Sequence, residues 1–370
     1  MAEVSRDALA GGEPERRITL IGGYPPPYGG NAAHLERLAD RLLLDGHALA
    51  VIDPYSAMVA VAPAGRRFAV APPPHGRLRG WLRLVGALRG HSPGSVVHVH
   101  MSAGGRFYRV APVLLGATRG AMKRILTVHS GSFERELEAL DGWNRRLALA
   151  ALGAFDDVIC VNPRQRELLR PLVRSRLHVI PAYLPASRAV GRKLPDPLRR
   201  LREAVDLLVV TSGYGTAIYD YATVVRAVEI AQSRLDARLG LVVATYATWD
   251  ADSWSRTLAS LERSSVPAVA TTDLDPEQFL LLLAQARLYV RATLTDGDAV
   301  AIREAASLGV QVLASDAVAR PPGSALFATR SADELAALIA RAAEDRDVGR
   351  LPPDAFADHY ASIRSIYLAG

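Results

Sequence analysis

Two acidic residues in the last third of the chain, Asp296 and Glu304, have a spacing that suits ligand binding. Apolar residues recur at helical spacing over 300–308, and Gly309 is suited to end that helix. Asp296 is therefore expected in a loop and Glu304 about two turns inside the helix. A loop carboxylate and free N–H groups at a helix start can hold a polar, phosphate-bearing ligand. An ordinary strand–loop–helix unit with solvated acids would show the same spacing.

Three other positions lie where open α/β sheets place ligands. Gly29 and Gly30 follow a predicted strand, at a point where a side chain would block the close approach of their backbone to a ligand. His129 ends a predicted strand at its carboxyl edge. Each has a structural alternative, namely a tight turn after three prolines and a histidine that caps the next loop. His98 and His100 face one side of a strand, but no further ligands accompany them, so we expect no metal site.

Three arginines bracket the acidic loop: Arg291, Arg303 and Arg320. The chain has only two lysines, Lys123 and Lys193, so any permanent cation that holds a phosphate after residue 193 must be an arginine. The planar guanidinium suits this task, because it binds phosphate oxygens in pairs. Arginines buried without anions would be costly, so the cluster predicts an anion near at least one of them. If the three arginines are solvated, they do not indicate an anion-binding site.

Strands and helices alternate along the chain, which predicts an α/β fold with doubly wound parallel sheets. Strands are expected at 18–22, 48–52, 96–100, 124–128, 158–161, 207–211, 241–244, 268–270, 288–291 and 310–314. Helices are expected at 31–44, 107–115, 143–152, 221–232, 253–264, 276–286, 332–344 and 353–368. We divide the chain into a disordered or loosely attached start (1–16), a first domain (17–185), a Pro- and Arg-rich linker (186–203), a second domain (204–350) and a C-terminal helix (351–370) that could cross back to the first domain.

Composition favours a cytoplasmic protein of two domains. The chain has 370 residues, of which 49% are hydrophobic, and one cysteine, Cys160, so it has no disulfide framework. The N-terminal stretch lacks the apolar core of a secretory signal, and no apolar run approaches the roughly 20 residues that span a bilayer. The net charge is +6, but no array of stacking aromatic and basic residues accompanies it, so nucleic acid is not an expected partner.

The segment 76–90 could make a peripheral contact with an anionic membrane. Its apolar residues fall on one helical face, and its arginines form the basic complement. A core helix with solvated arginines is the alternative. The apolar face consists of Leu78, Trp81, Leu82, Val85 and Leu88.

A series of short segments, in order along the chain, resembles the landmarks of family 4 glycosyltransferases. The region from Asp296 to Glu304 resembles the family's E-x7-E motif, with aspartate in place of the first glutamate. The resemblance implies the GT-B fold, in which two Rossmann-like domains face an interdomain cleft. The other matching segments are Pro27-Tyr-Gly-Gly30, Val97-His-Val-His100, Thr127-Val-His129, Asp157-Val-Ile-Cys-Val161 and Val179-Ile-Pro181.

The resemblance also implies an activity, in which the enzyme transfers a sugar with retention from a nucleotide-sugar donor to a hydroxyl acceptor. Glu304 would bind the ribose and Asp296 the hydroxyls of the donor sugar, whereas the amides of residues 297–299 (Gly297, Asp298 and Ala299) would stabilise the leaving phosphate. His129 would contact the donor sugar, and Gly29 and Gly30 the phosphates or the acceptor. No metal or other cofactor is implied. Polysaccharide, glycolipid and natural-product biosynthesis are the expected settings, and the acceptor could be lipid-linked on the inner face of the membrane.

The main departure from the family lies in residues 212–221. Family members usually have an arginine and a lysine on the pyrophosphate here, whereas this stretch has neither and leaves Gly213 to offer only an amide. Either Arg291, Arg303 or Arg320 substitutes, or the site no longer handles a nucleotide diphosphate. Two alternatives therefore stay open: a sugar-nucleotide epimerase on the same fold, and a catalytically silent partner of another transferase. The Asp-x-Asp pattern of Asp296 and Asp298 is a weak metal signal in this architecture.

Overall fold

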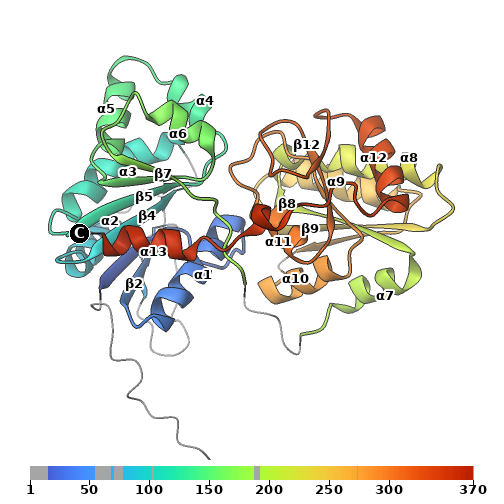
Figure 1. Cartoon of the computed structure of the whole chain (residues 1–370), viewed down its shortest axis with the longest axis horizontal. Helices are drawn as coiled ribbons and strands as arrows, with labels where there is room; N and C mark the ends of the chain where they lie inside the picture. The colour runs from blue at the N-terminus through green and yellow to red at the C-terminus, as the bar shows by residue number, and fades with distance from the viewer. Residues whose placement is uncertain are drawn as a thin grey trace, which may run out of the picture.

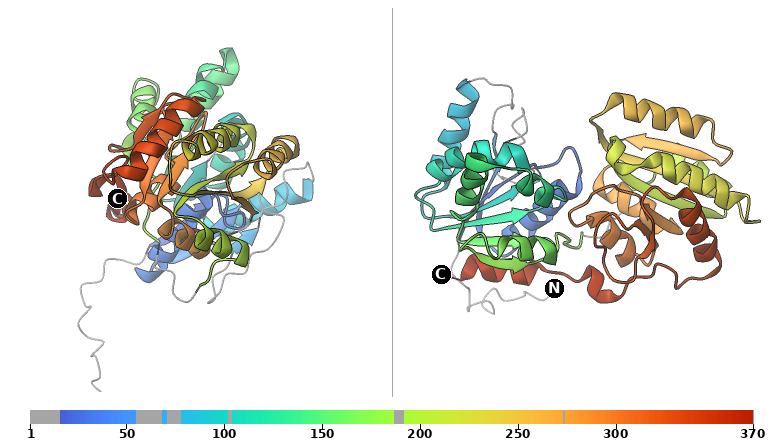
Figure 2. Two further views of the ribbon diagram at one scale, coloured as in Figure 1. Left: turned by 90° about the vertical axis from the view of Figure 1, so that its right-hand side faces the viewer. Right: turned by 90° about the horizontal axis from the view of Figure 1, so that it is seen from above.

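The computed structural model describes residues 16–54, 68–70, 78–101, 104–186, 192–272 and 274–369. Most of the N-terminal segment 1–16 thus lies outside the described residues. The chain forms two α/β domains that lie side by side (Figure 1). Each domain is built on one parallel sheet, and helices cover both of its faces (Figure 2). The predicted pair of Rossmann-like domains is confirmed.

The first domain contains a seven-stranded sheet in the order β3-β2-β1-β4-β5-β6-β7. All of its strand pairs are parallel, and the order reverses at β1, as in doubly wound folds. Its strands are β1 (Arg17–Ile21), β2 (Ala48–Asp53), β3 (Phe68–Val70), β4 (Val96–Met101), β5 (Lys123–Val128), β6 (Asp157–Cys160) and β7 (Arg176–Val179). Its helices are α1 (Gly30–Leu44), α2 (Leu78–His91), α3 (Gly104–Ala117), α4 (Phe133–Glu138), α5 (Gly142–Leu152) and α6 (Pro163–Leu169).

The second domain contains a six-stranded parallel sheet in the order β10-β9-β8-β11-β12-β13. Its strands are β8 (Leu207–Gly215), β9 (Leu239–Thr248), β10 (Ala268–Thr272), β11 (Leu288–Arg291), β12 (Gln311–Ser315) and β13 (Ala325–Phe327). Its helices are α7 (Asp196–Ala204), α8 (Tyr221–Gln232), α9 (Ala251–Glu262), α10 (Pro276–Ala284), α11 (Val300–Ser307) and α12 (Ala332–Glu344), with a 3-10 turn, η3 (Ala217–Tyr219), after β8.

The central strands are buried on both faces, which explains why they are continuous apolar runs. In β1, Ile18 and Leu20 pack against α1, while Ile21 packs against the helices on the other face. In the second domain, Val210 and Val209 divide in the same way between two clusters on opposite faces of the sheet. The carboxyl ends of the strands of both sheets are therefore left as the place for ligands.

The end of the chain returns to the first domain. After the turn η4 (Pro353–Phe356), helix α13 (Tyr360–Leu368) lies along the first domain, at the opposite end of the molecule from α12 (Figure 1). Ile363, Ile366 and Tyr367 are buried in the core of that domain. The Tyr367 hydroxyl and Nδ1 of His98 are 2.6 Å apart. The two domains are thus joined by two chain crossings.

The range expected as a linker contains a helix. Within 186–203, residues 187–191 lie outside the described residues, but α7 begins at Asp196 and buries Leu198 and Leu201 in the core of the second domain. Two three-residue strands, β3 and β13, were not predicted, because so short a segment shows no period. Helix α9 begins two residues earlier than expected, since the side chain of Asp250 accepts a hydrogen bond from the Ser253 amide and caps it.

Helix α2 occupies most of the segment considered for membrane contact, and residues 76 and 77 lie outside the described residues. Leu84 and Leu88 are buried in the core of the first domain, whereas Leu82 is 62% exposed. Leu88 of the predicted apolar face thus packs on the domain, as does Leu84, which was not assigned to that face, whereas Leu82 remains exposed. Among the described residues, no helix combines the length and apolar character needed to span a bilayer.

Candidate active site

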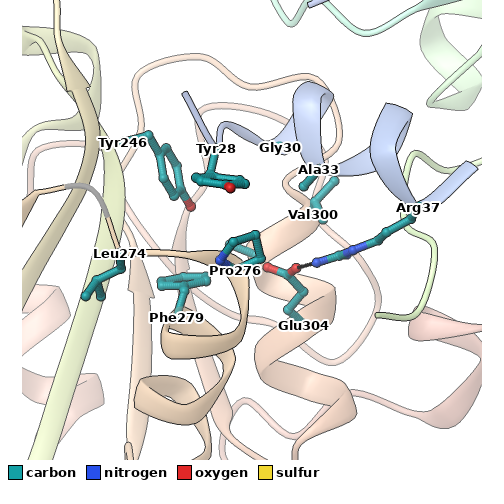
Figure 3. Close-up of a pocket in the computed structure, with 11 residues that line it drawn as sticks. Tyr28, Gly30, Ala33, Arg37, Tyr246, Leu274, Pro276, Phe279, Val300 and Glu304 are labelled. Carbon is teal, nitrogen blue, oxygen red and sulfur yellow. Dashed lines mark hydrogen bonds and ion pairs between the residues drawn. The ribbon is translucent and has the colours of Figure 1, made fainter. Parts of the chain in front are cut away.

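A narrow pocket lies between the two domains, with a cavity volume of about 30 Å³ (Figure 3). The first turns of α1 form one wall, and α10, α11 and the end of β9 form the other. Aromatic rings and one ion pair line it, a combination typical of small-molecule sites. The lining residues are Tyr28, Gly30, Ala33, Arg37, Tyr246, Leu274, Pro276, Phe279, Val300, Ala301 and Glu304.

Glu304 lies in the wall of this pocket, on α11, as the sequence predicted for its helix. Its carboxylate forms an ion pair with Arg37 of α1, and both side chains are buried (Figure 3). Arg37 also donates a 2.9 Å hydrogen bond to the carbonyl of Leu184. The ion pair therefore crosses from one domain to the other and occupies the carboxylate that was expected to hold the ribose.

Asp296 is buried between two arginines of its own domain. Arg291 donates to both carboxylate oxygens, at 2.8 and 3.2 Å, and Arg320 donates to one of them at 3.0 Å. Burial alone would raise the pKa of Asp296, but the two guanidinium groups outweigh burial and lower the pKa to about 2. The predicted arginine cluster is thus buried with an anion, and that anion is the carboxylate of the acidic loop itself.

Arg303 and Asp298 form a second pair beside the first. Arg303 contacts the Asp298 carboxylate at 2.8 Å and donates to the carbonyl of Ala355. The other side of that carboxylate accepts a 2.8 Å hydrogen bond from the amide of Ala182, in the first domain. These two residues therefore tie the start of α11 to the first domain and to η4. Ala299 is buried at the N-cap of α11.

Aromatic side chains fill the region where the sequence lacks the phosphate-binding arginine and lysine. A Cβ atom on Gly213 would lie 1.9 Å from the ring of Tyr219, so this ring covers the glycine. The ring of Tyr214 stacks on Trp249 with centroids 3.8 Å apart. The guanidinium of Arg291 lies over the Tyr219 ring, 4.9 Å from its centroid. Arg291 therefore reaches this region, held between a carboxylate and an aromatic face.

The two domains touch at glycines. A Cβ atom on Gly29 would lie 1.9 Å from the Tyr214 hydroxyl, and one on Gly131 would lie 2.0 Å from the carbonyl carbon of Asp296. Likewise, a Cβ atom on Gly297 would lie 2.1 Å from the carbonyl oxygen of His129. The close neighbour of Gly29 is thus a tyrosine side chain, whereas a Cβ atom on Gly30 would make only an ordinary contact, 3.6 Å from Val300.

His129 lies at the edge of the first sheet, where the sequence placed it, and its carbonyl faces Gly297 of the acidic loop. Its ring is buried beside the rings of His34 and His100. Burial and the neighbouring histidines lower its pKa well below the ordinary value, so the ring is neutral at neutral pH. Its backbone, rather than its ring, faces the opposite domain.

The structure brings most of the predicted residues to one boundary between the domains. Gly29, Gly30 and His129 come from the first domain, and the acidic loop, Glu304 and the three arginines come from the second. Sequence reasoning missed the aromatic walls and Arg37 as the partner of Glu304. Arg37 lies two turns after Gly30, on the same face of α1. This spacing was the local signal that could have placed Arg37 at the site. The missed aromatic residues are Tyr28, Tyr246 and Phe279.

Comparison with known proteins supports the resemblance. The model of Glycosyltransferase Family 4 matches residues 28–188. An apo structure of OtsA superposes with a TM-score of 0.70, at 14% identity, and covers 96% of this chain and 99% of its own. Sucrose-phosphate synthase from Thermosynechococcus elongatus gives 0.67 at 16% identity, covering 95% of each chain. Anabaena HepE, in complex with UDP and glucose, gives 0.65 at 15% identity, covering 95% of this chain and 96% of its own. No curated protein matches the chain.

The two parallel-sheet domains of the protein define the class of fold as GT-B, and the family model matches the first domain. Within that class, its first domain carries the sequence pattern of Glycosyltransferase Family 4. The resemblance seen in the sequence is thereby confirmed for the fold and for the first domain.

Proposed function

We propose that the protein is a retaining glycosyltransferase that moves a sugar from a nucleotide-sugar donor to a hydroxyl acceptor. The nucleotide enters the pocket between the domains, where Glu304 holds the ribose and the rings of Tyr246 and Phe279 contact the apolar parts of the nucleotide. The donor sugar extends toward His129 and Asp296, and the acceptor lies on the side of the first domain.

The observation that carries this proposal is the pocket itself. Glu304, the second acid of the family motif, lines this pocket together with aromatic side chains and with Gly30 at the start of α1. In a GT-B fold, the crevice at the carboxyl ends of both sheets is where ligands are expected. HepE, whose structure contains UDP and glucose, has the same fold.

Donor binding then requires an exchange at Glu304. Its carboxylate is bound to Arg37, so the ribose hydroxyls must share it or replace the guanidinium. Arg37 keeps a second partner in the carbonyl of Leu184, which it can retain while it releases the carboxylate. The nucleotide would thus take over a contact that joins the two domains.

The charge of the acidic loop supports an anionic leaving group. Arg291 and Arg320 supply two positive charges and Asp296 supplies one negative charge, which leaves one positive charge buried in the same network. A buried charge without a counterion is costly, and a phosphate offsets it. The amides of Gly297 to Ala299 add fixed dipoles at the start of α11. Donors that are already oriented stabilise the charge that develops on the leaving phosphate.

A thermal-shift screen of nucleotides and nucleotide sugars tests the proposal first. A bound nucleotide stabilises the folded protein and so raises the melting temperature. At a ligand concentration of one hundred times the dissociation constant, the free energy of unfolding increases by about 2.7 kcal/mol. The best donor is then incubated with and without hydroxyl acceptors, and the anomeric configuration of the product is determined by NMR. Transfer with retention supports the proposal, and conversion of the donor without an acceptor identifies an epimerase instead.

One observation favours a catalytically silent partner as the second candidate. Tyrosine rings occupy the usual place of the phosphate-binding cations, and all three arginines of the loop are paired with carboxylates of this chain. If no nucleotide or nucleotide sugar changes the melting temperature and titration calorimetry detects no heat, the silent partner is the correct reading.

A lipid-linked acceptor at the inner face of the membrane is a further part of the proposal. It is supported by α2, which presents Leu82 and Arg89 on its exposed side. Flotation with vesicles of anionic phospholipid tests it, with Leu82→Glu as the variant. Binding that is lost in this variant supports membrane contact, and equal flotation of both proteins, or of neither, refutes a role for α2.

A further inference from the structure

We propose that His34, His100 and His129 form a binding site for a divalent transition-metal ion such as Zn²⁺. The three rings come from α1, from β4 and from the residue after β5, so segments distant in sequence converge on one point. All three side chains are buried, and one ring nitrogen from each lies within 4.8 Å of the others. This site does not rest on the proposed transfer reaction.

The spacing of the rings fits one shared ion. The ring centroids are 5.1 Å apart for His34 and His129, 5.4 Å for His34 and His100, and 5.4 Å for His100 and His129. Three imidazoles that bind one tetrahedral ion, with Zn–N distances of about 2.0–2.1 Å, have centroids about 5 Å apart. The observed triangle is therefore nearly equilateral and of the right size.

The nitrogen atoms are also available. Nδ1 of His34 lies 2.6 Å from the carbonyl of Ala182, and because a carbonyl only accepts, Nδ1 must carry the proton. Nε2 of His34 is then left with a lone pair, and it is buried without a hydrogen-bond partner. An N–H donated to a backbone carbonyl is the usual outer contact of a metal-binding histidine, since it fixes the tautomer and orients the ring.

The other two rings share a single weak contact. Nδ1 of His100 and Nε2 of His129 are 3.1 Å apart, and the remaining nitrogens, Nε2 of His100 and Nδ1 of His129, are buried without partners. Tetrahedral ligands at about 2.0–2.1 Å from one ion are themselves a little over 3 Å apart, so the two facing nitrogens already have that spacing. Metal binding would replace their shared proton with the ion.

The chemistry of the cluster selects the kind of ion. Burial lowers the pKa of all three histidines, so each offers a neutral ring at neutral pH. Imidazole nitrogens suit Zn²⁺, Co²⁺, Ni²⁺ and Cu²⁺, whereas Mg²⁺ and Ca²⁺ require oxygen ligands. Three protein ligands leave a fourth position for water. His98 lies beside the cluster but is not a ligand, because Tyr367 and Thr127 occupy both of its nitrogens.

Cobalt titration of the full-length protein tests the site. The protein is stripped with a chelator, dialysed and titrated with Co²⁺, while the visible absorption of tetrahedral cobalt is recorded. The expected result is an intense band that saturates at one equivalent, disappears on addition of Zn²⁺ and is unaffected by excess Mg²⁺. Elemental analysis after gel filtration should give one zinc per chain.

Single variants show which histidines hold the ion. His34→Gln, His100→Gln and His129→Gln should each weaken Co²⁺ binding at least tenfold, whereas His91→Gln, at the end of α2 and outside the cluster, should bind as the wild type does. The wild-type titration decides the matter even if a variant fails to fold. No saturable cobalt band, less than one-tenth of an equivalent of zinc, or equal binding by His34→Gln and wild type would each overturn the proposal.

Discussion

The two acids of the motif, Asp296 and Glu304, are eight residues apart and yet are held in different ways. Asp296 pairs with Arg291 and Arg320, and both of these partners belong to its own domain. Glu304 pairs with Arg37 of the other domain, so its partner leaves when the domains separate. Asp296 therefore stabilises the structure of its own loop, whereas the ion pair of Glu304 depends on how the two domains are placed.

This difference assigns different tasks to two similar side chains. A carboxylate paired with two arginines fixes the conformation of the loop and its electrostatic potential. Breaking these buried ion pairs would be costly. A carboxylate with one partner across a domain boundary can change that partner for a ligand. The comparison therefore predicts stability effects at Asp296 and binding effects at Glu304.

The largest expected effect is on stability. Asp296→Ala leaves two buried guanidinium groups without their anion, which should lower the free energy of unfolding by about 3–5 kcal/mol. Urea denaturation followed by circular dichroism measures it. Arg37→Ala is the matched control, because its partner, Glu304, can reach water when the domains open, and a smaller loss is expected. Equal losses in the two variants would remove the distinction between the acids.

Acid should weaken the first domain through its buried histidines. Burial lowers the pKa of His34 from 6.5 to about 4. The unfolded chain therefore binds more protons between these two pH values, and stability is complete above pH 6.5 and falls as the pH decreases toward 4. The shift corresponds to about 3 kcal/mol for this residue. Melting temperatures of the metal-free protein across this range measure it. His34→Gln should flatten the pH dependence, and an unchanged slope would contradict the assignment.

Closure of the boundary depends on glycine. Gly131→Ala places a methyl group 2.0 Å from the carbonyl carbon of Asp296, so the two loops must separate. A displacement of about 1 Å at a reacting centre can cost about one hundredfold in rate, and kcat/KM for transfer should fall by that order. Gly116→Ala, in α3 and outside the pocket, is the control, because its Cβ atom would meet no other group within 4 Å. Equal activity of both variants would show that closure at Gly131 is not required.

Sequence patterns predicted the central strands of the two sheets because these strands are continuous apolar runs buried on both faces. They also placed Asp296 in a loop and Glu304 on a helix, since helical periodicity and Gly309 define α11. The ion-pair partners of the acidic residues differ in how easily the sequence predicts them. Arg291 lies five residues before Asp296, and Arg303 lies five residues after Asp298, so local pairing could have been inferred. Arg37 is 267 residues from Glu304, and only the docking of two domains brings them together.

The histidines illustrate the same limit. In the sequence, His98 and His100 form a pair on one face of a strand. This pattern suggested His98 as the neighbour of His100 in a cluster, but His98 is not part of it. His98 is occupied by groups from other elements, while His34 of α1 and His129 after β5 complete the triangle around His100. Side-chain period identifies residues on one face of one strand, but it carries no information about the helix that covers that face.

The donor affinity of two variants tests the central claim, that Glu304 exchanges Arg37 for the ribose. Glu304→Ala and Arg37→Ala both remove the ion pair, but only the first removes the ribose ligand. We expect Glu304→Ala to raise the donor KM at least tenfold, because a hydrogen bond to a charged group contributes about 1.5–3 kcal/mol. Arg37→Ala should leave the KM unchanged or lower it. An equal rise in both variants, or no rise in Glu304→Ala, would contradict the account.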